Sequence, residues 1–326
     1  MKNTAKIPAS PGLLTPPYSP LVEAHSPFYF PRYASTVFQG LLRPHRPLLG
    51  DNSAVTTFRS RTRDSSMRRW QQFAGHGDAD LPVPFTYLNS AGAYCLTRLL
   101  QALHINLSRV MHLKASIRLT QPLQAIRPDE IYTVHMCIKE IIPLKNRALL
   151  VTDSAIVDHE GQSIRHHVDH WHIRDTPTEA PGSMHPDTLQ FRRLSQRTPG
   201  WQEWDDSTRL TARFYLPAGA ARHYAAISGD YTPHATRLGA RLFGQKRPFM
   251  QGFGLMNLAL HHLTQMSAKP LQELAIVFAR PALTGQDIAV HSNGASFEMC
   301  SRDNELLAFG QVAHVNSNSG SPQTQA

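Results

Sequence analysis

The sequence predicts an α+β fold made of two similar units, each an antiparallel sheet wrapped around one long buried helix. In the first half, an apolar segment with helical spacing precedes four strand-like runs, and the same order returns in the second half. A Pro-rich stretch separates the halves. A repeat of this size is typical of duplicated α+β domains, with convergent strand patterning as the alternative.

The elements of each half follow from their periodicity. The first half has a helical segment at 93–103 and strand-like runs at 111–120, 131–141, 148–158 and 164–173. The second half has a helical segment at 253–263 and runs at 274–279, 288–292, 296–301 and 306–315. In both halves a proline ends the first strand and an aspartate precedes the next, which favours a true repeat.

Proline-rich segments set the predicted boundaries, because proline cannot sustain helix or sheet hydrogen bonding. We expect a disordered leader at 1–26, a first repeat at 27–175, a linker at 176–200, a second repeat at 201–316 and a disordered tail at 317–326. The leader lacks the apolar stretch of a secretory signal.

Composition indicates a soluble globular chain. The 326 residues are 41% hydrophobic and 17% charged, and no apolar run approaches the roughly 18 residues of a membrane span. Cys95, Cys137 and Cys300 lie far apart and form no CxxC pair. We therefore expect no membrane association, a reducing compartment and a cytoplasmic location.

The net charge of +9 is unevenly distributed, since residues 1–80 hold ten Lys or Arg and five Asp or Glu. Five arginines between 59 and 69 lie beside Phe58 and Trp70. Stacking on these rings would serve an RNA-binding protein. A solvated basic surface, or one that attracts phosphate groups, is the favoured interpretation, so we expect no nucleic-acid partner.

The segment 224–234 holds the first candidate for chemistry. Asp230 and His234 lie four residues apart on a turn-forming stretch, from which both could face one pocket. An Asp and a His that share a water molecule form an acid–base pair for adding or removing water across a double bond. The alternative is an ordinary loop with a structural role.

The segment 247–257 holds the second candidate. A proline-bounded loop runs into the glycine-containing start of the apolar helix at Gly252. Unpaired amides at a helix N-terminus stabilise a developing oxyanion when glycine lets a carbonyl approach. The alternative is a glycine that allows close helix packing.

Together the two segments resemble the MaoC-like hot-dog family, which includes R-specific enoyl-CoA hydratases and the dehydratase parts of fatty-acid synthases. The family motif reads Tyr-x-x-x-Ser-Gly-Asp-x-Asn-Pro-x-His and, later, Arg-Pro-x-x-His-Gly-Met. The residues that match are Tyr224, Ser228, Gly229, Asp230, Pro233, His234, Arg247, Pro248 and Gly252. Residues 81–174 resemble more faintly the motif-poor repeat of two-repeat members.

The resemblance implies a double hot-dog fold and an acyl-thioester hydro-lyase. It would interconvert 2-enoyl and 3-hydroxyacyl thioesters of CoA or acyl carrier protein in fatty-acid or related acyl metabolism. Asp230 and His234 would be catalytic, and Gly252, with Gln251 and Phe253, would hold the thioester carbonyl. The supporting motif residues would be Tyr224, Ser228, Gly229, Thr232, Pro233 and Arg247. The resemblance implies no metal or redox cofactor, and either a homodimer or a pseudo-dimeric monomer.

The motif departs from the family at three places. Thr232 replaces Asn, His234 follows Asp230 by four residues rather than five, and Gln251 replaces His. These departures keep two alternatives open. One is a catalytically inactive hot-dog protein that binds acyl thioesters or acts as an assembly partner, and the other is an acyl thioesterase.

A histidine-rich run in the first half offers a metal alternative. Strand alternation would put His166, His170 and His172 on one face. A chain with 18 histidines produces clusters by chance, so we predict no metal site.

Overall fold

The computed structural model describes residues 35, 38–40, 42, 55–62, 64–74, 89–121, 126–144, 146–175, 197–228, 230–267 and 270–315. The predicted leader and tail and most of the predicted linker lie outside these residues, as does Gly229. None of the described helices is both long and apolar enough to cross a membrane.

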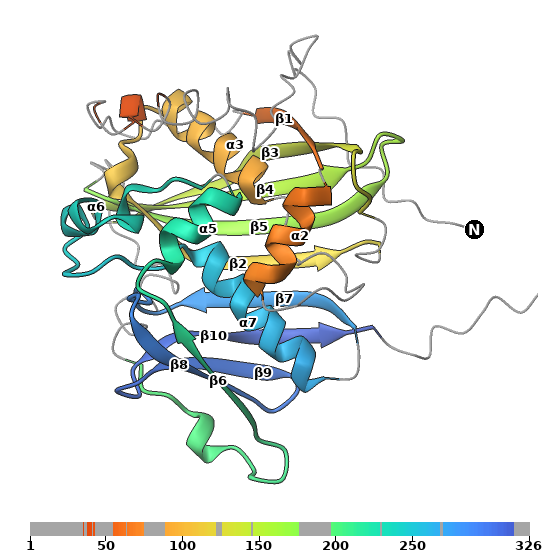
Figure 1. The fold of residues 1–326 in the computed structure, drawn as a ribbon. Coiled ribbons are helices and arrows are strands. Elements are labelled where there is room, and N and C mark those ends of the chain that lie inside the picture. The colour runs from red at the N-terminus through yellow and green to blue at the C-terminus, as the bar shows by residue number, and fades with distance from the viewer. Residues whose placement is uncertain are drawn as a thin grey trace, which may run out of the picture.

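The core of the molecule is one antiparallel sheet of ten strands in the order β1-β3-β4-β5-β2-β7-β10-β9-β8-β6 (Figure 1). The first five strands are β1 (Val55–Arg61), β2 (Val110–Leu119), β3 (Ile131–Leu144), β4 (Arg147–Val157) and β5 (Ser163–Arg174). The second five are β6 (Leu210–Leu216), β7 (Leu271–Phe278), β8 (Gln286–Ser292), β9 (Ser296–Ser301) and β10 (Leu306–His314).

The two halves of the sheet have the same strand order and meet at β2 and β7. From its outer edge to the junction, the first half has the order β1-β3-β4-β5-β2. The second half, also from its outer edge to the junction, has the equivalent order β6-β8-β9-β10-β7. At the junction β2 and β7 pair antiparallel, with Ser116 opposite Ala275. An ion pair of 3.1 Å between Arg118 Nε and Glu273 Oε1 crosses the same strands. The predicted α+β double hot-dog architecture is therefore confirmed.

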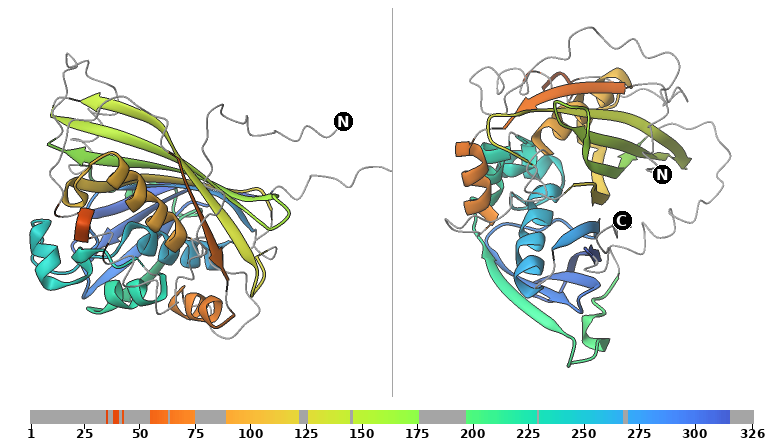
Figure 2. Two further views of the ribbon diagram at one scale, coloured as in Figure 1. Left: turned by 90° about the horizontal axis from the view of Figure 1, so that it is seen from above. Right: turned by 90° about the vertical axis from the view of Figure 1, so that its right-hand side faces the viewer.

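Each half wraps around one long helix, α3 (Asn89–Ala102) in the first and α7 (Gly252–Met266) in the second. Both helices lie on the same side of the curved sheet (Figure 2). Helix α3 packs against β1 and β3, whereas α7 packs against β7, β8 and α2 (Asp64–Ala74). Because α7 is covered on several sides, apolar residues bury around most of its circumference, and its amphipathicity is weak.

The structure adds an edge strand before the helix of each half, where the sequence predicted four strands after it. Among the described strands, β1 pairs with β3 alone and β6 with β8 alone. Their sequences, VTTFRSR and LTARFYL, mix arginine and threonine with apolar residues because the outer strand of a sheet is half solvated. That mixture weakens the strand signal in the sequence.

The two aromatic rings of the basic region near the start of the described chain belong to the core. Phe58 and Trp70 are each 1% exposed, and Trp70 packs edge-on against Tyr224 with ring centroids 5.4 Å apart. The neighbouring Arg68 and Arg69 face solvent from the opposite side of α2. These two rings are therefore not available for the base stacking that the RNA-binding alternative invoked.

Candidate active site

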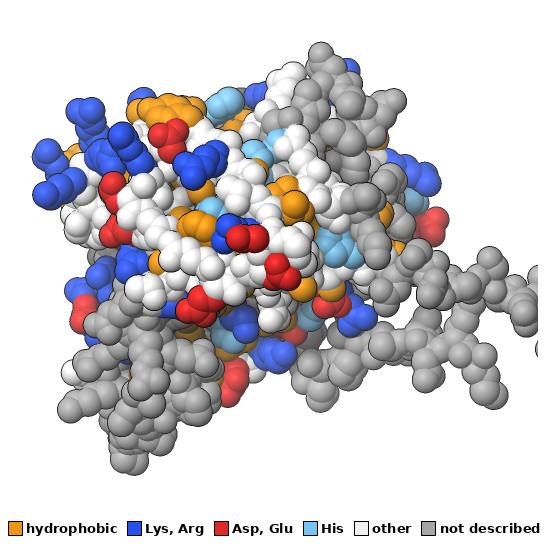
Figure 3. Space-filling model, turned by 90° about the horizontal axis from the view of Figure 1, so that it is seen from below, with side chains coloured by type: hydrophobic (Ala, Val, Ile, Leu, Met, Phe, Trp, Pro, Cys, Tyr) orange, Lys and Arg blue, Asp and Glu red, His pale blue; other side chains and the backbone are white. Residues whose placement is uncertain are grey.

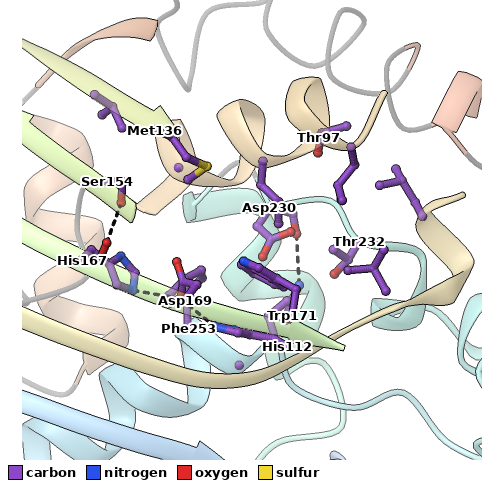
Figure 4. A pocket seen from close by; sticks show the side chains of 18 of the residues that line it. Thr97, His112, Met136, Ser154, His167, Asp169, Trp171, Asp230, Thr232 and Phe253 are labelled. Atoms are coloured by element: carbon purple, nitrogen blue, oxygen red, sulfur yellow. Dashed lines mark hydrogen bonds and ion pairs between the residues drawn. The ribbon is translucent and has the colours of Figure 1, made fainter. Parts of the chain in front are cut away.

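A cavity of about 160 Å³ lies between the two halves, and we call it the inner cavity (Figure 4). The first half lines it from α3 and from β2 to β5, and the second half from residues 230–234 and the start of α7. The predicted site residues that line it are Asp230, Thr232, Pro233, His234, Gln251, Gly252 and Phe253. The fold thus brings both candidate segments to one place.

Asp230 follows α5 (Ala220–Ser228) and is buried with 7% of its surface exposed. Its backbone N–H donates to Ser228 Oγ at 3.1 Å, which closes the turn at the end of the helix. Ser228 itself is not among the residues that line the inner cavity.

His234 lies in a short 3₁₀ helix, η4 (Pro233–Ala235), and Pro233 opens that turn. Its Nδ1 donates to the backbone carbonyl of Phe249 at 3.0 Å, and its ring stacks on Phe249 with centroids 4.0 Å apart. Because a carbonyl only accepts, Nδ1 carries the proton and Nε2 keeps its lone pair. Burial lowers the pKa of His234 to about 4, although the hydrogen bond to Phe249 opposes the shift. His234 is thus a neutral base at pH 7.

Gln251, the N-cap residue of α7, is 2% exposed. Its Nε2 donates to the backbone carbonyls of Ala221 and Asp230, both at 3.1 Å. These two bonds fix which end of the amide carries the nitrogen. Its Oε1 is buried and finds no hydrogen-bond partner among the described residues.

Gly252 begins α7 at a place with no room for a side chain. A Cβ atom there would lie 3.0 Å from His112 Nδ1 and 3.1 Å from the Phe278 ring. The first amides of a helix have no intrahelical acceptor. Gly252 and Phe253 line the inner cavity, so the N-terminal end of α7 adjoins it.

Two other predicted residues lie away from the inner cavity. Tyr224 is fully buried between α5 and α2, where its ring lies 5.4 Å from that of Trp70 and 5.6 Å from that of Phe73. Burial raises the pKa of Tyr224 well above its usual value. Arg247 is exposed, and its Nη1 lies 3.5 Å from the carbonyl of Gly285. Both are framework residues of the motif.

The first half adds a polar cluster that the sequence did not reveal. Alternate residues of β5, namely Arg165, His167, Asp169 and Trp171, line the inner cavity together with His112 of β2. Charged residues that alternate along a strand normally mark its solvent face. Here they mark the enclosed face, and only the packing of the second half against it shows this.

Asp169 is the centre of this group, which we call the Asp169 cluster (His112, Arg165, His167, Asp169). Asp169 Oδ1 accepts from His112 Nε2 at 2.8 Å and lies 3.0 Å from His167 Nε2. Burial alone would raise the pKa of Asp169, but the two imidazoles outweigh it and hold the pKa below its usual range. Burial lowers the pKa of Arg165 to about 10, and Asp169 opposes that shift. Asp169 and Arg165 therefore stay charged at pH 7.

The metal alternative rested on the other face of β5. There His166 Nε2 lies 2.6 Å from Asp153 Oδ1, so this histidine is paired with a carboxylate. In the part of the chain that the structure describes, no group of three or more His, Cys, Asp or Glu is placed to hold a metal ion.

A second cavity of about 170 Å³, the outer cavity, adjoins the inner one. The two share His112, His234 and Gly252 in their walls. Arg174 and Arg280 line the outer cavity. Near it, α6 (Arg237–Leu242) and the loop after it expose four basic residues, Arg237, Arg241, Lys246 and Arg247. Basic side chains gather on the side of the molecule where α6 lies (Figure 3).

Comparison with known proteins relates the fold to solved structures. No model of a known protein family matches the chain, and no curated protein matches it. HtdX of Mycobacterium tuberculosis is 15% identical, with a TM-score of 0.60 over 80% of this chain and 100% of HtdX. A MaoC-like dehydratase of Phytophthora capsici is 16% identical, with a TM-score of 0.61 over 81% of this chain and 98% of its own.

A conserved hypothetical protein of M. tuberculosis, described as having a double hotdog fold, is 12% identical, with a TM-score of 0.50 over 81% of this chain and 96% of its own. Together with the strand order and the two central helices, these similarities identify the architecture. The chain has the double hot-dog fold of the MaoC-like dehydratases.

Proposed function

We propose that this protein is a MaoC-like hydro-lyase that interconverts 2-enoyl and 3-hydroxyacyl thioesters. The observation that supports the proposal best is that Asp230, His234 and the start of α7 all line the inner cavity. The four-residue spacing of Asp230 and His234, one shorter than in the family motif, does not keep either residue out of this cavity.

The proposed chemistry needs a water molecule between Asp230 and His234. His234 Nε2 would accept a proton from this water as its oxygen bonds to the β-carbon. The π electrons would move to the thioester oxygen, where the amide of Gly252 stabilises the charge. Asp230, entering the step protonated, would give its proton to the α-carbon, and the proton taken by His234 would afterwards restore Asp230, so that one water adds as H and OH.

The carrier of the acyl chain would be anionic. Arg174 and Arg280 line the outer cavity, and the exposed basic residues of α6 lie close to it. Such a surface would attract the phosphates of CoA or of the prosthetic group of an acyl carrier protein. Cys95, Cys137 and Cys300 are free thiols, and we retain the cytoplasmic location expected from the sequence.

The test is hydration of crotonyl-CoA and longer 2-enoyl-CoAs, followed by loss of the enoyl-thioester absorbance. We expect turnover by the unmodified protein and its loss in Asp230→Asn and His234→Ala. Asp303→Asn and His159→Ala, both at exposed positions, are the matched controls and should keep full activity.

Other outcomes point to the alternatives. Thermal stabilisation by acyl-CoA without turnover would contradict hydration and favour an inactive thioester-binding protein. Release of free thiol without hydration would instead favour a thioesterase. Full activity in both Asp230→Asn and His234→Ala would contradict the catalytic roles proposed for these two residues.

A further inference from the structure

The first half of the double hot-dog supplies a polar group directly at the site where a carbonyl would meet Gly252. His112 lines both cavities, and its Nδ1 is the heavy atom nearest to a Cβ built on Gly252, at 3.0 Å. Its side chain is 11% exposed. His112 therefore lies at the same junction as the first amides of α7, on the opposite wall.

The orientation of His112 is fixed on all sides. Its Nε2 donates to Asp169 at 2.8 Å, which leaves Nδ1 as the ring nitrogen free to face the junction. Its ring stacks on Trp171 with centroids 4.0 Å apart and an interplanar angle of 17°. Phe253 and Phe278 contact it with centroid distances of 4.7 and 4.9 Å. Figure 4 shows His112, Asp169, Trp171 and Phe253 in this arrangement.

The charged groups around His112 also favour its acting as a hydrogen-bond donor to an oxyanion. The described titratable groups nearest to it are Asp169 and, through Asp169, His167 and Arg165. The ionised Asp169 carboxylate supplies a counter-charge on the Nε2 side of the ring. A protonated imidazole in this position would present Nδ1–H to the cavity.

We propose that His112, held by Asp169 as an imidazolium with a proton on each ring nitrogen, is a catalytic residue that donates Nδ1–H to the thioester carbonyl oxygen beside the amide of Gly252. This rests on the proposed function of the same cavity. The negative charge that forms on the oxygen when water adds to the β-carbon is shared between two donors, one from each half. When the α-carbon takes up its proton, the C=C pair of the enolate forms the new Cα–H bond, the oxygen re-forms the C=O double bond, and His112 keeps its own proton. The motif-poor half thus completes the site.

The test measures carbonyl polarisation in a thioester that cannot be hydrated. The probe is [1-¹³C]butyryl-pantetheine, which carries the arm common to CoA and acyl carrier protein. We expect a downfield shift of its carbonyl ¹³C resonance on binding to the unmodified protein. His112→Phe keeps the ring contacts with Trp171, Phe253 and Phe278 but removes the donor, and should lose most of this shift.

Asp169→Asn is a second variant that keeps the proposal testable if His112→Phe misfolds. It retains the acceptor for His112 Nε2 and removes only the negative charge. It should reduce both the ¹³C shift and kcat for crotonyl-pantetheine, with KM nearly unchanged. Loss of one oxyanion donor predicts a decrease in kcat of roughly 100-fold. The matched control is Asp153→Asn, which alters the His166–Asp153 pair elsewhere on β4 and β5 and should change neither quantity.

The outcomes separate this proposal from the proposed function. An unchanged ¹³C shift in His112→Phe, or no shift in the unmodified protein, overturns the role of His112 even if hydration occurs. A shift that depends on His112 and Asp169 without any hydration supports the carbonyl contact and overturns the hydro-lyase instead. Failure of butyryl-pantetheine to bind overturns both.

Discussion

The side-chain amide of Gln251 donates a hydrogen bond to the backbone carbonyl of Asp230 at 3.1 Å. The same nitrogen donates to Ala221, so one side chain joins α5, the loop of Asp230 and the N-terminus of α7. Gln251 stands where the MaoC-like motif has histidine. In this chain the residue therefore holds the two candidate segments together.

Replacing Gln251 should lower stability as well as activity. In Gln251→Ala the buried carbonyls of Ala221 and Asp230 lose a donor, which costs roughly 2 kcal/mol or more. We expect a fall in the urea midpoint and weaker hydration. Gln245→Ala, a half-buried glutamine in the loop after α6, is the comparison. Equal stability of Gln251→Ala and the unmodified protein would contradict this role.

Gly252 should be essential for activity. In Gly252→Ala the new Cβ lies within about 3 Å of His112 and Phe278 and occupies the approach to the α7 amides. A displacement of about 1 Å at such a site costs about 100-fold in rate. We expect that loss in kcat/KM, measured on crotonyl-CoA. Gly219→Ala, where a Cβ meets nothing within 4 Å, should leave activity unchanged.

Activity should fall at an unusually low pH on the acid side of the pH profile. His234 acts as a base only when neutral, and burial lowers its pKa to about 4. Because protonation removes the Nε2 lone pair, kcat/KM should stay level from about pH 7 to pH 5 and fall by half near pH 4. Circular dichroism in the same buffers separates inactivation from unfolding. An acid limb near pH 6.5 would mean that His234 is solvated or has another role.

The inner cavity should favour short acyl chains. A protein cavity of about 150 Å³ accommodates benzene, so about 160 Å³ would hold an acyl chain of roughly six carbons. We expect higher kcat/KM for crotonyl-CoA and 2-hexenoyl-CoA than for 2-dodecenoyl-CoA. Met136→Ala, which enlarges the cavity, should move the preference to longer chains. Met67→Ala, on the buried face of α2 outside the cavity, should not.

Helix α2 should matter for stability through its buried face alone. Trp70→Ala removes an aromatic side chain that is 1% exposed and packs on Tyr224, at a cost of about 3–5 kcal/mol. Arg68 forms an exposed ion pair with Asp64, so Arg68→Ala should change the free energy of unfolding by less than about 0.5 kcal/mol. Thermal unfolding of the two variants compares them directly. A larger effect of Arg68→Ala would contradict the packing of α2.

The sequence by itself determined much of the fold. The helical period at 93–103 and 253–263 corresponds to α3 and α7, and the strand runs after each correspond to β2–β5 and β7–β10 within a few residues. These signals are local, because burial of one face imposes a period on neighbouring residues. The segment that carries Asp230, His234 and Gly252 was also visible, because turn residues and a helix start follow local rules.

Only the tertiary structure decided which polar residues face the inner cavity. Edge strands β1 and β6 escaped prediction because half-solvated strands mix polar and apolar residues. Arg165, His167 and Asp169 alternate along β5, as the residues of a solvent face usually do, yet they line the inner cavity beside His112. Alternation along a strand assigns its residues to two faces, but it does not show which of the two faces is covered by the rest of the protein. That depends on contacts between residues more than fifty positions apart, such as His112 with Asp169 and His167 with Phe253, which no local pattern encodes.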